Sequence, residues 1–215
     1  MRKAFFISFE GGEGTGKSTQ VKLLANKLSD RGDQVYITRE PGGTEVSEKI
    51  RDILKSFPSI DSITELLLMF AARREHFVKA ILPRLNQGHT VICDRFYDSS
   101  LVYQGILKKI PIEQIIQLKE MTLRNFEPDF TIILDIPSSL AKERTQRRQL
   151  CLDNYDMMSE DDYNIIRDGF RKIAETFPFR CKLINASGDE KRVSSRILKA
   201  VERFKSQQNL VTFNR

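Results

Sequence analysis

The stretch FEGGEGTGKSTQ, Phe9 to Gln20, contains four glycines and one lysine within twelve positions. It lies between an apolar, β-rich stretch at residues 4–10 and a helical pattern over residues 17–32. A glycine in a regular element costs about 0.5–1 kcal/mol relative to alanine, so this cluster indicates a backbone shaped for something other than packing. Residues 11–18 fit G-x-x-x-x-G-K-[ST] in the strand-to-helix context that the pattern requires, which predicts a loop whose amides bind phosphate.

The elements on either side of this loop predict the fold. Strands buried on both faces are expected at residues 4–10, 34–40, 89–94, 130–136 and 181–186. Helices are expected at residues 17–32, 45–56, 62–87, 111–126, 137–149, 159–176 and 189–205. This alternation predicts an α/β protein with three layers, α/β/α, around a five-stranded parallel sheet. Ligands of such sheets bind at the carboxyl ends of the strands, so the residues after each strand are candidates for function.

The length and composition of the chain are typical of one soluble domain. The 215 residues contain no linker-like segment, so we expect a single domain over residues 1–205 and a flexible tail over residues 206–215. No apolar run reaches the roughly 18–20 residues of a membrane span, and the N-terminus reaches Glu10 before a secretory core could form. Three scattered cysteines without a C-x-x-C pair predict neither disulfides nor a zinc site. We therefore expect a cytoplasmic protein with no membrane partner.

The phosphate loop predicts an ATP site. Lys17 is expected to reach the β- and γ-phosphates, and the Ser18 hydroxyl is expected to join the ligands of the Mg²⁺ that accompanies ATP. The residues expected to contact ATP are Gly11, Gly12, Glu13, Gly14, Thr15, Gly16, Lys17, Ser18 and Thr19. The motif does not tell which molecule receives the phosphoryl group.

Charged residues follow the second and third predicted strands. After the second, Glu40 and Pro41 lead into a turn and then a helix that carries Arg51. After the third comes Asp94-Arg95, where the carboxylate is suited to lie near the metal and the arginine to bind a second phosphate. Taken alone, Arg51 is typical of a solvated helix arginine, and Asp94 with Arg95 could be a surface ion pair.

Four segments together resemble bacterial thymidylate kinases, which phosphorylate dTMP to dTDP with ATP. They are FEGGEGTGKST, TREPGGT, FAAR and DRFYDSSLVYQG, in this order and spacing, and the likeness extends from about residue 3 to residue 186. The resemblance implies a fold of the P-loop NTPase type with a short helical lid, Mg²⁺ as cofactor, ATP and dTMP as partners, and a homodimer. For the dimer, helix faces within residues 62–82 and 111–126 are candidate contacts.

The resemblance also assigns roles to side chains of the acceptor site. It implies that Glu13 lies near the sugar and phosphate of the acceptor and that Arg51 and Arg95 hold the acceptor monophosphate. Tyr103 would lie where a ribose 2′-hydroxyl would project, which favours deoxyribose. Lys17, Glu13 and Arg95 are accordingly expected to be catalytic. The other residues expected to line this site are Glu40, Pro41, Ser99, Ser100 and Gln104.

The helix that contains ELLLMFAARREHF leaves two registers open for recognition of the base. Counting back from Pro83 aligns Arg73 with the arginine that reads thymine in the family and puts Met69 where a phenylalanine is usual. Counting by aromatic identity gives Phe70 and Arg74 instead. We prefer Arg73, with Phe70 or Met69 against the ring. A Leu/Met/Phe stripe is also what any buried helix would show.

A basic segment follows the fourth predicted strand. Arg144, Arg147 and Arg148 precede an irregular stretch, and a lid is expected over about residues 144–158. Members of the resembled family without an arginine in the phosphate loop usually carry the arginine that acts on the transferring phosphoryl group in this lid. The resemblance therefore points to Arg147 or Arg148 as catalytic. A plain solvated basic helix is the alternative.

Two other functions stay open at this point. Another P-loop kinase, acting on a different nucleoside monophosphate or a small metabolite, would share residues 11–18 and Asp94-Arg95 but has no reason for TREPGGT or YQG. A nucleic-acid-associated P-loop ATPase would suit the net charge of +6. Because the aromatic residues do not form a stacking strip among the lysines, we expect no nucleic-acid partner.

Overall fold

A computed structural model describes residues 4–57, 59–147 and 158–213 of the chain. Its described strands form one parallel sheet in the order β2-β3-β1-β4-β5. The strands are β1 (Phe6–Glu10), β2 (Val35–Arg39), β3 (Thr90–Asp94), β4 (Phe130–Asp135) and β5 (Cys181–Asn185). The predicted five-stranded parallel sheet is confirmed, and each strand lies within the range expected from the sequence.

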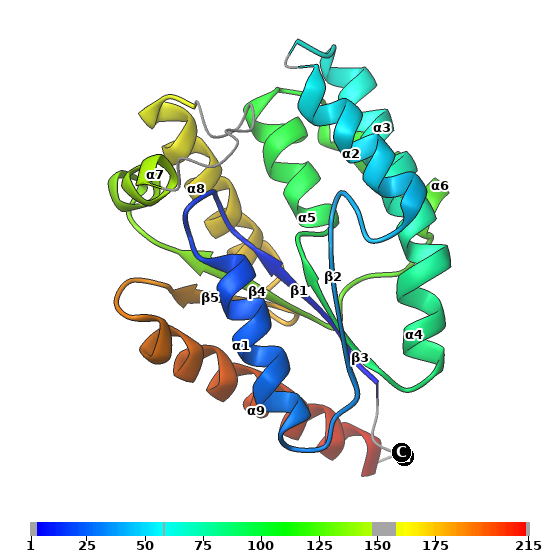
Figure 1. Cartoon of the computed structure of the whole chain (residues 1–215), viewed down its shortest axis with the longest axis vertical. Helices are drawn as coiled ribbons and strands as arrows, with labels where there is room; N and C mark the ends of the chain where they lie inside the picture. The colour runs from blue at the N-terminus through cyan, green and yellow to red at the C-terminus, as the bar shows by residue number, and fades with distance from the viewer. Residues whose placement is uncertain (1–3, 58, 148–157, 214–215) are drawn as a thin grey trace.

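Helices cover both faces of the sheet (Figure 1). They are α1 (Lys17–Ser29), α2 (Glu45–Ser56), α3 (Ser62–His76), α4 (Leu82–Asn86), α5 (Tyr97–Ser100), α6 (Ile112–Leu123), α7 (Ser138–Arg147), α8 (Glu160–Thr176) and α9 (Glu190–Phe213). Two π-helical segments, η1 (Phe77–Ile81) and η2 (Leu101–Leu107), continue α3 and α5. α1 and α9 pack on one face, and α3, η2, α6 and α8 on the other, which gives the predicted three layers.

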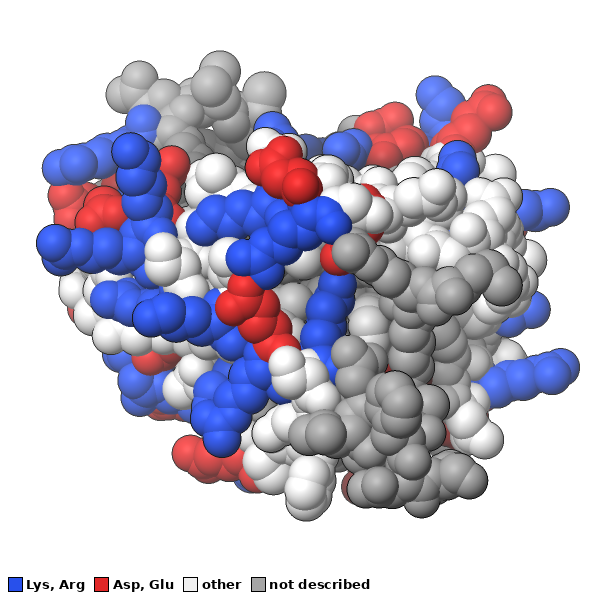
Figure 2. Space-filling view, turned by 90° about the horizontal axis from the view of Figure 1, so that it is seen from below, with Lys and Arg blue, Asp and Glu red and all other residues white. Residues whose placement is uncertain are grey.

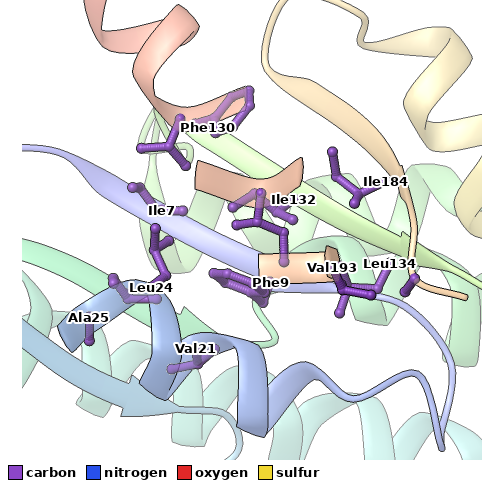
Figure 3. Close-up of a cluster of buried hydrophobic side chains, with 14 of the residues drawn as sticks. Ile7, Phe9, Val21, Leu24, Ala25, Phe130, Ile132, Leu134, Ile184 and Val193 are labelled. Carbon is purple, nitrogen blue, oxygen red and sulfur yellow. The ribbon is translucent and has the colours of Figure 1, made fainter. Parts of the chain in front are cut away.

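Alternation along the central strands builds two hydrophobic cores from one sheet. Ile7 and Phe9 of β1 point to the side of α1 and α9, whereas Phe6 points to the opposite side. Figure 3 shows the first core, with Ile7, Phe9, Val21, Leu24, Ile132 and Val193 among its labelled residues. β1, β3 and β4 are buried on both faces, as predicted. The same prediction is wrong for β2 and β5, because edge strands have a neighbour on one side only and several of their residues remain exposed.

Three further differences separate the helices from the sequence prediction. The helix predicted over residues 62–87 is interrupted by the π-turn η1, which needs an extra residue per turn and leaves no mark in a 3.6-residue period. The sequence pattern does not predict the helical segment over residues 97–107, because its polar residues are buried along with its apolar ones and the two kinds do not separate into opposite faces. α9 continues through residues 206–213, beyond the end of the helix expected over residues 189–205.

The register of the sheet places three loops side by side at its carboxyl edge. Phe9 of β1 and Arg39 of β2 are both paired with Asp94 of β3. The phosphate loop, the turn after β2 and the segment after β3 therefore begin at the same level of neighbouring strands. Among the described residues, no helix combines the length and apolar character needed to cross a membrane.

Candidate active site

The phosphate loop joins β1 to α1 and is packed tightly against α7. Gly14 has a φ of +71°, and a Cβ at this position would lie 2.2 Å from the carbonyl oxygen of Ala141. Only glycine therefore fits between the loop and α7 without displacing one of them. The Thr15 hydroxyl braces the loop by donating to the Gly12 carbonyl at 2.8 Å. Gly16 is the N-cap of α1, so the first amides of this helix face the loop as an anion site.

Lys17 is buried within the phosphate loop. Its Nζ donates to the carbonyl oxygens of Gly11 at 2.9 Å and Gly12 at 2.7 Å. Burial, followed by the charge of Arg95, lowers the pKa of Lys17 to about 8. The negative charge of a polyanion beside Lys17 would raise this pKa again, because it favours the charged form of the lysine.

Ser18 and Asp94 come together from two different strands. The Ser18 hydroxyl, in the first turn of α1, donates to Asp94 Oδ2 at 2.6 Å at the end of β3. A hydroxyl beside a carboxylate at the mouth of the phosphate loop supplies the hard oxygen ligands that Mg²⁺ prefers, the remainder coming from phosphate and water. The structure thus brings together both residues that the sequence assigned to the metal.

Arg95, Glu13 and Tyr103 form one cluster above the loop. Arg95 Nη2 donates to Glu13 Oε1 at 2.6 Å and to the Tyr103 hydroxyl at 3.1 Å, and that hydroxyl donates to Glu13 Oε2 at 2.7 Å. Burial alone would lower the pKa of Arg95, but Tyr103 and Glu13 raise it, so the guanidinium stays charged. Burial raises the pKa of Tyr103 well above its usual range. Arg95 also has a φ of +70°, a backbone strain of the kind that is retained at functional sites.

Glu10 supports this cluster from below. Its carboxyl group accepts the Phe96 N–H at 2.7 Å and lies 2.6 Å from the Ser99 hydroxyl, which in turn accepts from Arg95 at 3.1 Å. Burial and then the nearby charge of Asp98 raise the pKa of Glu10 to about 8. Ser99, predicted to line the nucleoside pocket, therefore also links a buried carboxyl group to Arg95.

Arg51 reaches the turn after β2. Its Nη1 donates to the Pro41 carbonyl at 2.9 Å from α2, whose N-terminus is capped by the Thr44 side chain. Arg39, for which the sequence analysis predicts no role, lines the same pocket and pairs with both carboxylate oxygens of Glu48 at 3.0 and 2.9 Å. Burial would raise the pKa of Glu48, but the Gly43 N–H and Arg39 hold it below its usual range.

Arg73 is buried deeper in the same region. Its Nε donates to Glu40 Oε2 at 2.6 Å and its Nη1 to the Ser100 hydroxyl at 3.0 Å. The guanidinium lies over the Phe70 ring, 4.6 Å from its centroid. The sequence predicts that Glu40 lines the acceptor site, and in the structure its carboxylate accepts a hydrogen bond from Arg73. Phe70 lies against Arg73 with only 1 % of its surface exposed.

The alternative register on α3 points elsewhere. Arg74 Nη1 donates to the Thr122 carbonyl of α6 at 2.7 Å, on a different side of the helix from Arg73. Met69 is half-buried on α3. Gln104, the last residue of the predicted nucleoside pocket, is buried and donates to Glu65 Oε1 of α3 at 2.7 Å. These contacts favour Arg73 over Arg74 as the arginine near the acceptor.

The predicted lid is only partly within the described residues. Arg147 lies at the end of α7 with 77 % of its side chain exposed, and it pairs with Glu143 one turn away. Arg144 is half-buried on the same helix. Arg148 and the segment 148–157 lie outside the described residues.

An open pocket connects the phosphate loop to the arginines. It is lined by Glu13, Gly14, Gly16, Lys17, Ser18, Arg39, Glu40, Arg51, Asp94 and Arg95. Four cationic side chains therefore face one cavity together with the candidate metal ligands. Such a pocket can hold two polyanions close together, because the cations offset their mutual repulsion.

Sequence reasoning missed several residues of this region. Arg39 and Glu10 could have been found, since both are the last residues of strands whose carboxyl ends carry the site. His76, which contacts Glu40, and Arg180, which binds Asp98 beneath α5, had no local signal. Their partners lie 36 and 82 positions away in the sequence.

Comparisons with known proteins agree with this geometry. A family model described as thymidylate kinase matches residues 9–197. A thymidylate kinase of Vesicomyosocius okutanii is 42% identical over 92% of this chain and 97% of its own length, and one of Ligilactobacillus salivarius is 40% identical over 93% and 98%. A crystal structure of thymidylate kinase from Ehrlichia chaffeensis superposes with a TM-score of 0.77 and 37% identity, covering 92% of this chain and 98% of that one. The loop, the sheet order and these relatives lead to one conclusion: the chain belongs to the thymidylate kinase family.

Proposed function

We propose that this protein transfers the γ-phosphoryl group of ATP to dTMP, which yields dTDP and ADP. The observation that carries the proposal is the shared pocket: Lys17 of the phosphate loop faces the same cavity as Arg51 and Arg95. One set of groups is suited to ATP, and the other to the phosphate of a second nucleotide. The family model and the relatives support thymidylate as that nucleotide.

In this reaction the protein must position the two nucleotides, and it has little proton transfer to perform. An oxygen of the dTMP phosphate is already an anionic nucleophile; it forms the new bond to the γ-phosphorus as the bond to the β,γ-bridging oxygen breaks, and ADP leaves with that electron pair. Lys17 would neutralise charge on the ATP side, and Arg51 and Arg95 on the acceptor side. Glu13 holds Arg95 in place and, with Tyr103, forms the wall beside the acceptor sugar.

Mg²⁺ is proposed as the cofactor, held by Ser18 and Asp94 together with phosphate oxygens. The proposal is supported by the 2.6 Å hydrogen bond from the Ser18 hydroxyl to Asp94 Oδ2, which brings the two side-chain oxygens together beside the loop. When bound, the ion would offset the negative charge of the triphosphate. The chain's own contribution is to orient the Ser18 hydroxyl through Asp94.

A lid arginine is proposed to complete the site. Within the described part of the chain, Arg147 pairs with Glu143 in an exposed i,i+4 contact worth under about 1 kcal/mol, so it can leave this partner for a phosphoryl group. Arg148 is the second candidate. Replacing the acting arginine by alanine should reduce kcat by about 10³-fold, whereas replacing the other should reduce it far less.

A homodimer and a cytoplasmic location are further parts of the proposal. α3 and α6 carry exposed apolar side chains at Ile63, Leu67, Ile116 and Met121, within the two segments predicted as dimer contacts. Burial of such groups would favour association. Sedimentation equilibrium at micromolar concentration would give about twice the monomer mass. The buried free thiols of Cys93 and Cys181 are consistent with a reducing compartment.

The test is a comparison of acceptors. ADP release, followed in a coupled assay with dTMP, dUMP, dCMP and dGMP, should show the highest kcat/KM for dTMP. No preference for dTMP would refute the assignment and favour another P-loop kinase, although the relatives do not support that alternative.

The nucleic-acid alternative rests on surface charge away from the pocket. Figure 2 shows lysine and arginine side chains gathered on the face seen from below, at the end of the molecule where α9 lies in Figure 1. The exposed residues Arg192, Arg196, Lys199 and Arg203 lie along one side of α9. ATP turnover that needs a monophosphate and does not respond to added DNA or RNA would dismiss this alternative.

A further inference from the structure

A fully buried polar chain runs from β2 to the proposed base-reading arginine. It consists of Thr38, His76, Glu40 and Arg73, whose side chains connect β2 and the turn after it to the end of α3. The exposed fractions of His76, Arg73 and Glu40 are 0, 1 and 3 %. Buried charges are retained only when they are paired, so each link of this chain constrains the next.

Arg73 is held from two sides at the end of this chain. Glu40 Oε2 accepts from its Nε, while Nη1 donates to the Ser100 hydroxyl and Nη2 to the Phe96 carbonyl. The planar guanidinium cannot rotate without losing the short Glu40 contact. The direction of its two outer nitrogens is therefore set by where Glu40 lies.

Glu40 is in turn held by His76. His76 Nδ1 lies 3.2 Å from Glu40 Oε1, and His76 Nε2 lies 2.6 Å from the Thr38 hydroxyl. Since a carboxylate only accepts, Nδ1 carries the proton and donates to Glu40. In the tautomer with its proton on Nδ1, Nε2 can accept from the Thr38 hydroxyl, so this tautomer satisfies both contacts.

The turn after β2 fixes the imidazole itself. Gly43 has a φ of +84°, and a Cβ there would lie 2.5 Å from His76 Cδ2 and Nε2. The backbone of the turn is therefore seated directly on the ring. His76 connects this turn, which also carries the Pro41 carbonyl bound by Arg51, to the arginine on α3.

We propose that His76 is a positioning residue for base recognition: it orients Glu40, and through Glu40 it sets the direction in which Arg73 presents its donors to the pyrimidine. The inference rests on the proposed function, because it assigns Arg73 to the base of dTMP. This positioning role depends on the hydrogen bond from His76 Nδ1 to Glu40, so a side chain that only fills the volume of the ring would not perform it.

Two variants of similar shape distinguish the roles of the two ring nitrogens of His76. The amide nitrogen of asparagine can occupy the place of Nδ1, whereas that of glutamine reaches the place of Nε2. His76→Asn keeps the donor to Glu40 and His76→Gln loses it. We expect His76→Gln to raise the KM for dTMP by about tenfold, since a hydrogen bond to a charged group is removed, and to leave kcat and the KM for ATP within about twofold of wild type. His76→Asn should stay within about threefold in all three.

A second route reaches the same link without touching the ring. Thr38→Val keeps the shape but removes the donor to Nε2, which frees the imidazole to take the other tautomer; the KM for dTMP should rise about fivefold. This variant decides the question if His76→Gln does not fold. His89→Gln, at the N-terminal start of β3 and far from the pocket, is the matched control and should behave as wild type.

The outcomes distinguish the inference from the proposed function. Equal effects of His76→Gln and His76→Asn, or an unchanged KM for dTMP in both His76→Gln and Thr38→Val, would overturn the positioning role while the wild type still phosphorylates dTMP. A wild-type protein that does not phosphorylate dTMP would overturn the proposed function and this inference with it.

Discussion

The buried carboxyl group of Glu10 makes the stability of the fold depend on pH in a definite direction. Its pKa is raised from 4.5 to about 8, first by burial and then by Asp98, so the folded state holds a proton that the unfolded chain has released. Between these two values the unfolded state binds fewer protons, and the free energy of unfolding falls as pH rises, by about 1.4 kcal/mol per pH unit. The contribution is complete below pH 4.5 and lost above pH 8.

The substitution Glu10→Gln removes this dependence while keeping the contacts. A glutamine oxygen can accept the Phe96 N–H as the carboxyl group does, and its amide nitrogen takes the place of the second oxygen beside the Ser99 hydroxyl. From pH 5.5 to 7.5 the wild type should lose about 2.5 kcal/mol of stability relative to Glu10→Gln. For a chain of this size, that difference corresponds to roughly 5–10 °C in Tm.

The assay is urea unfolding followed by far-UV circular dichroism at several pH values, with both proteins fitted for the free energy of unfolding and for m. Glu113→Gln, which removes an exposed carboxylate on α6, is the control and should follow the wild type at every pH. Parallel pH profiles for wild type and Glu10→Gln would refute the reasoning, since Glu10 would then ionise in the folded state as it does in the unfolded one.

The remaining predictions concern the phosphate loop and the contact of Arg180 with Asp98 of α5. Because the pKa of Lys17 is lowered to about 8, ATP binding at pH 8 should be accompanied by uptake of about half a proton, which titration calorimetry in buffers of different ionisation enthalpy would detect; a binding enthalpy independent of buffer would contradict this. Gly14→Ala should weaken ATP binding and lower Tm, because its Cβ meets the Ala141 carbonyl, while Gly88→Ala, also at positive φ but with open space around it, should show only the backbone strain of about 1–2 kcal/mol; similar losses in both would argue against the clash. Arg180→Met should destabilise the fold by about 3–5 kcal/mol, since it leaves Asp98 buried without its bidentate partner; the double variant with Asp98→Asn should recover part of that loss in a melting experiment.

Much of the fold followed from the sequence because its signals are local. The strand into the phosphate loop and the helix out of it are encoded within residues 4–32, and the central strands are apolar enough to be recognised singly. The order of the strands in the sheet is a different kind of information. It depends on which strands pair across 50 or more residues of sequence, as β4 does with β5, and no periodicity records this.

The residues of the candidate site also differ in whether a local sequence signal or a long-range contact reveals them. Lys17, Ser18 and Asp94 could be found because each stands next to a strand end or within a motif of fixed spacing. The sequence leaves two registers open, and only the resemblance to the family prefers Arg73 over Arg74. In the structure the two arginines have different partners: Arg73 donates to Glu40, and Arg74 donates to the Thr122 carbonyl. His76 shows the limit most clearly. Its role depends on Glu40 and Thr38, which are contributed by another element and are brought to the ring only by folding.

The contact between Gly14 and Ala141 has a mechanical consequence for the nucleotide site. With no room for even one methyl group between them, the loop that would cradle the phosphates and the helix bearing Arg147 cannot shift independently. If the loop moves toward α7, or α7 toward the loop, the contact between Gly14 and the Ala141 carbonyl pushes on the other element. Changes in the backbone of α7 near Ala141 should therefore alter how tightly the triphosphate is bound.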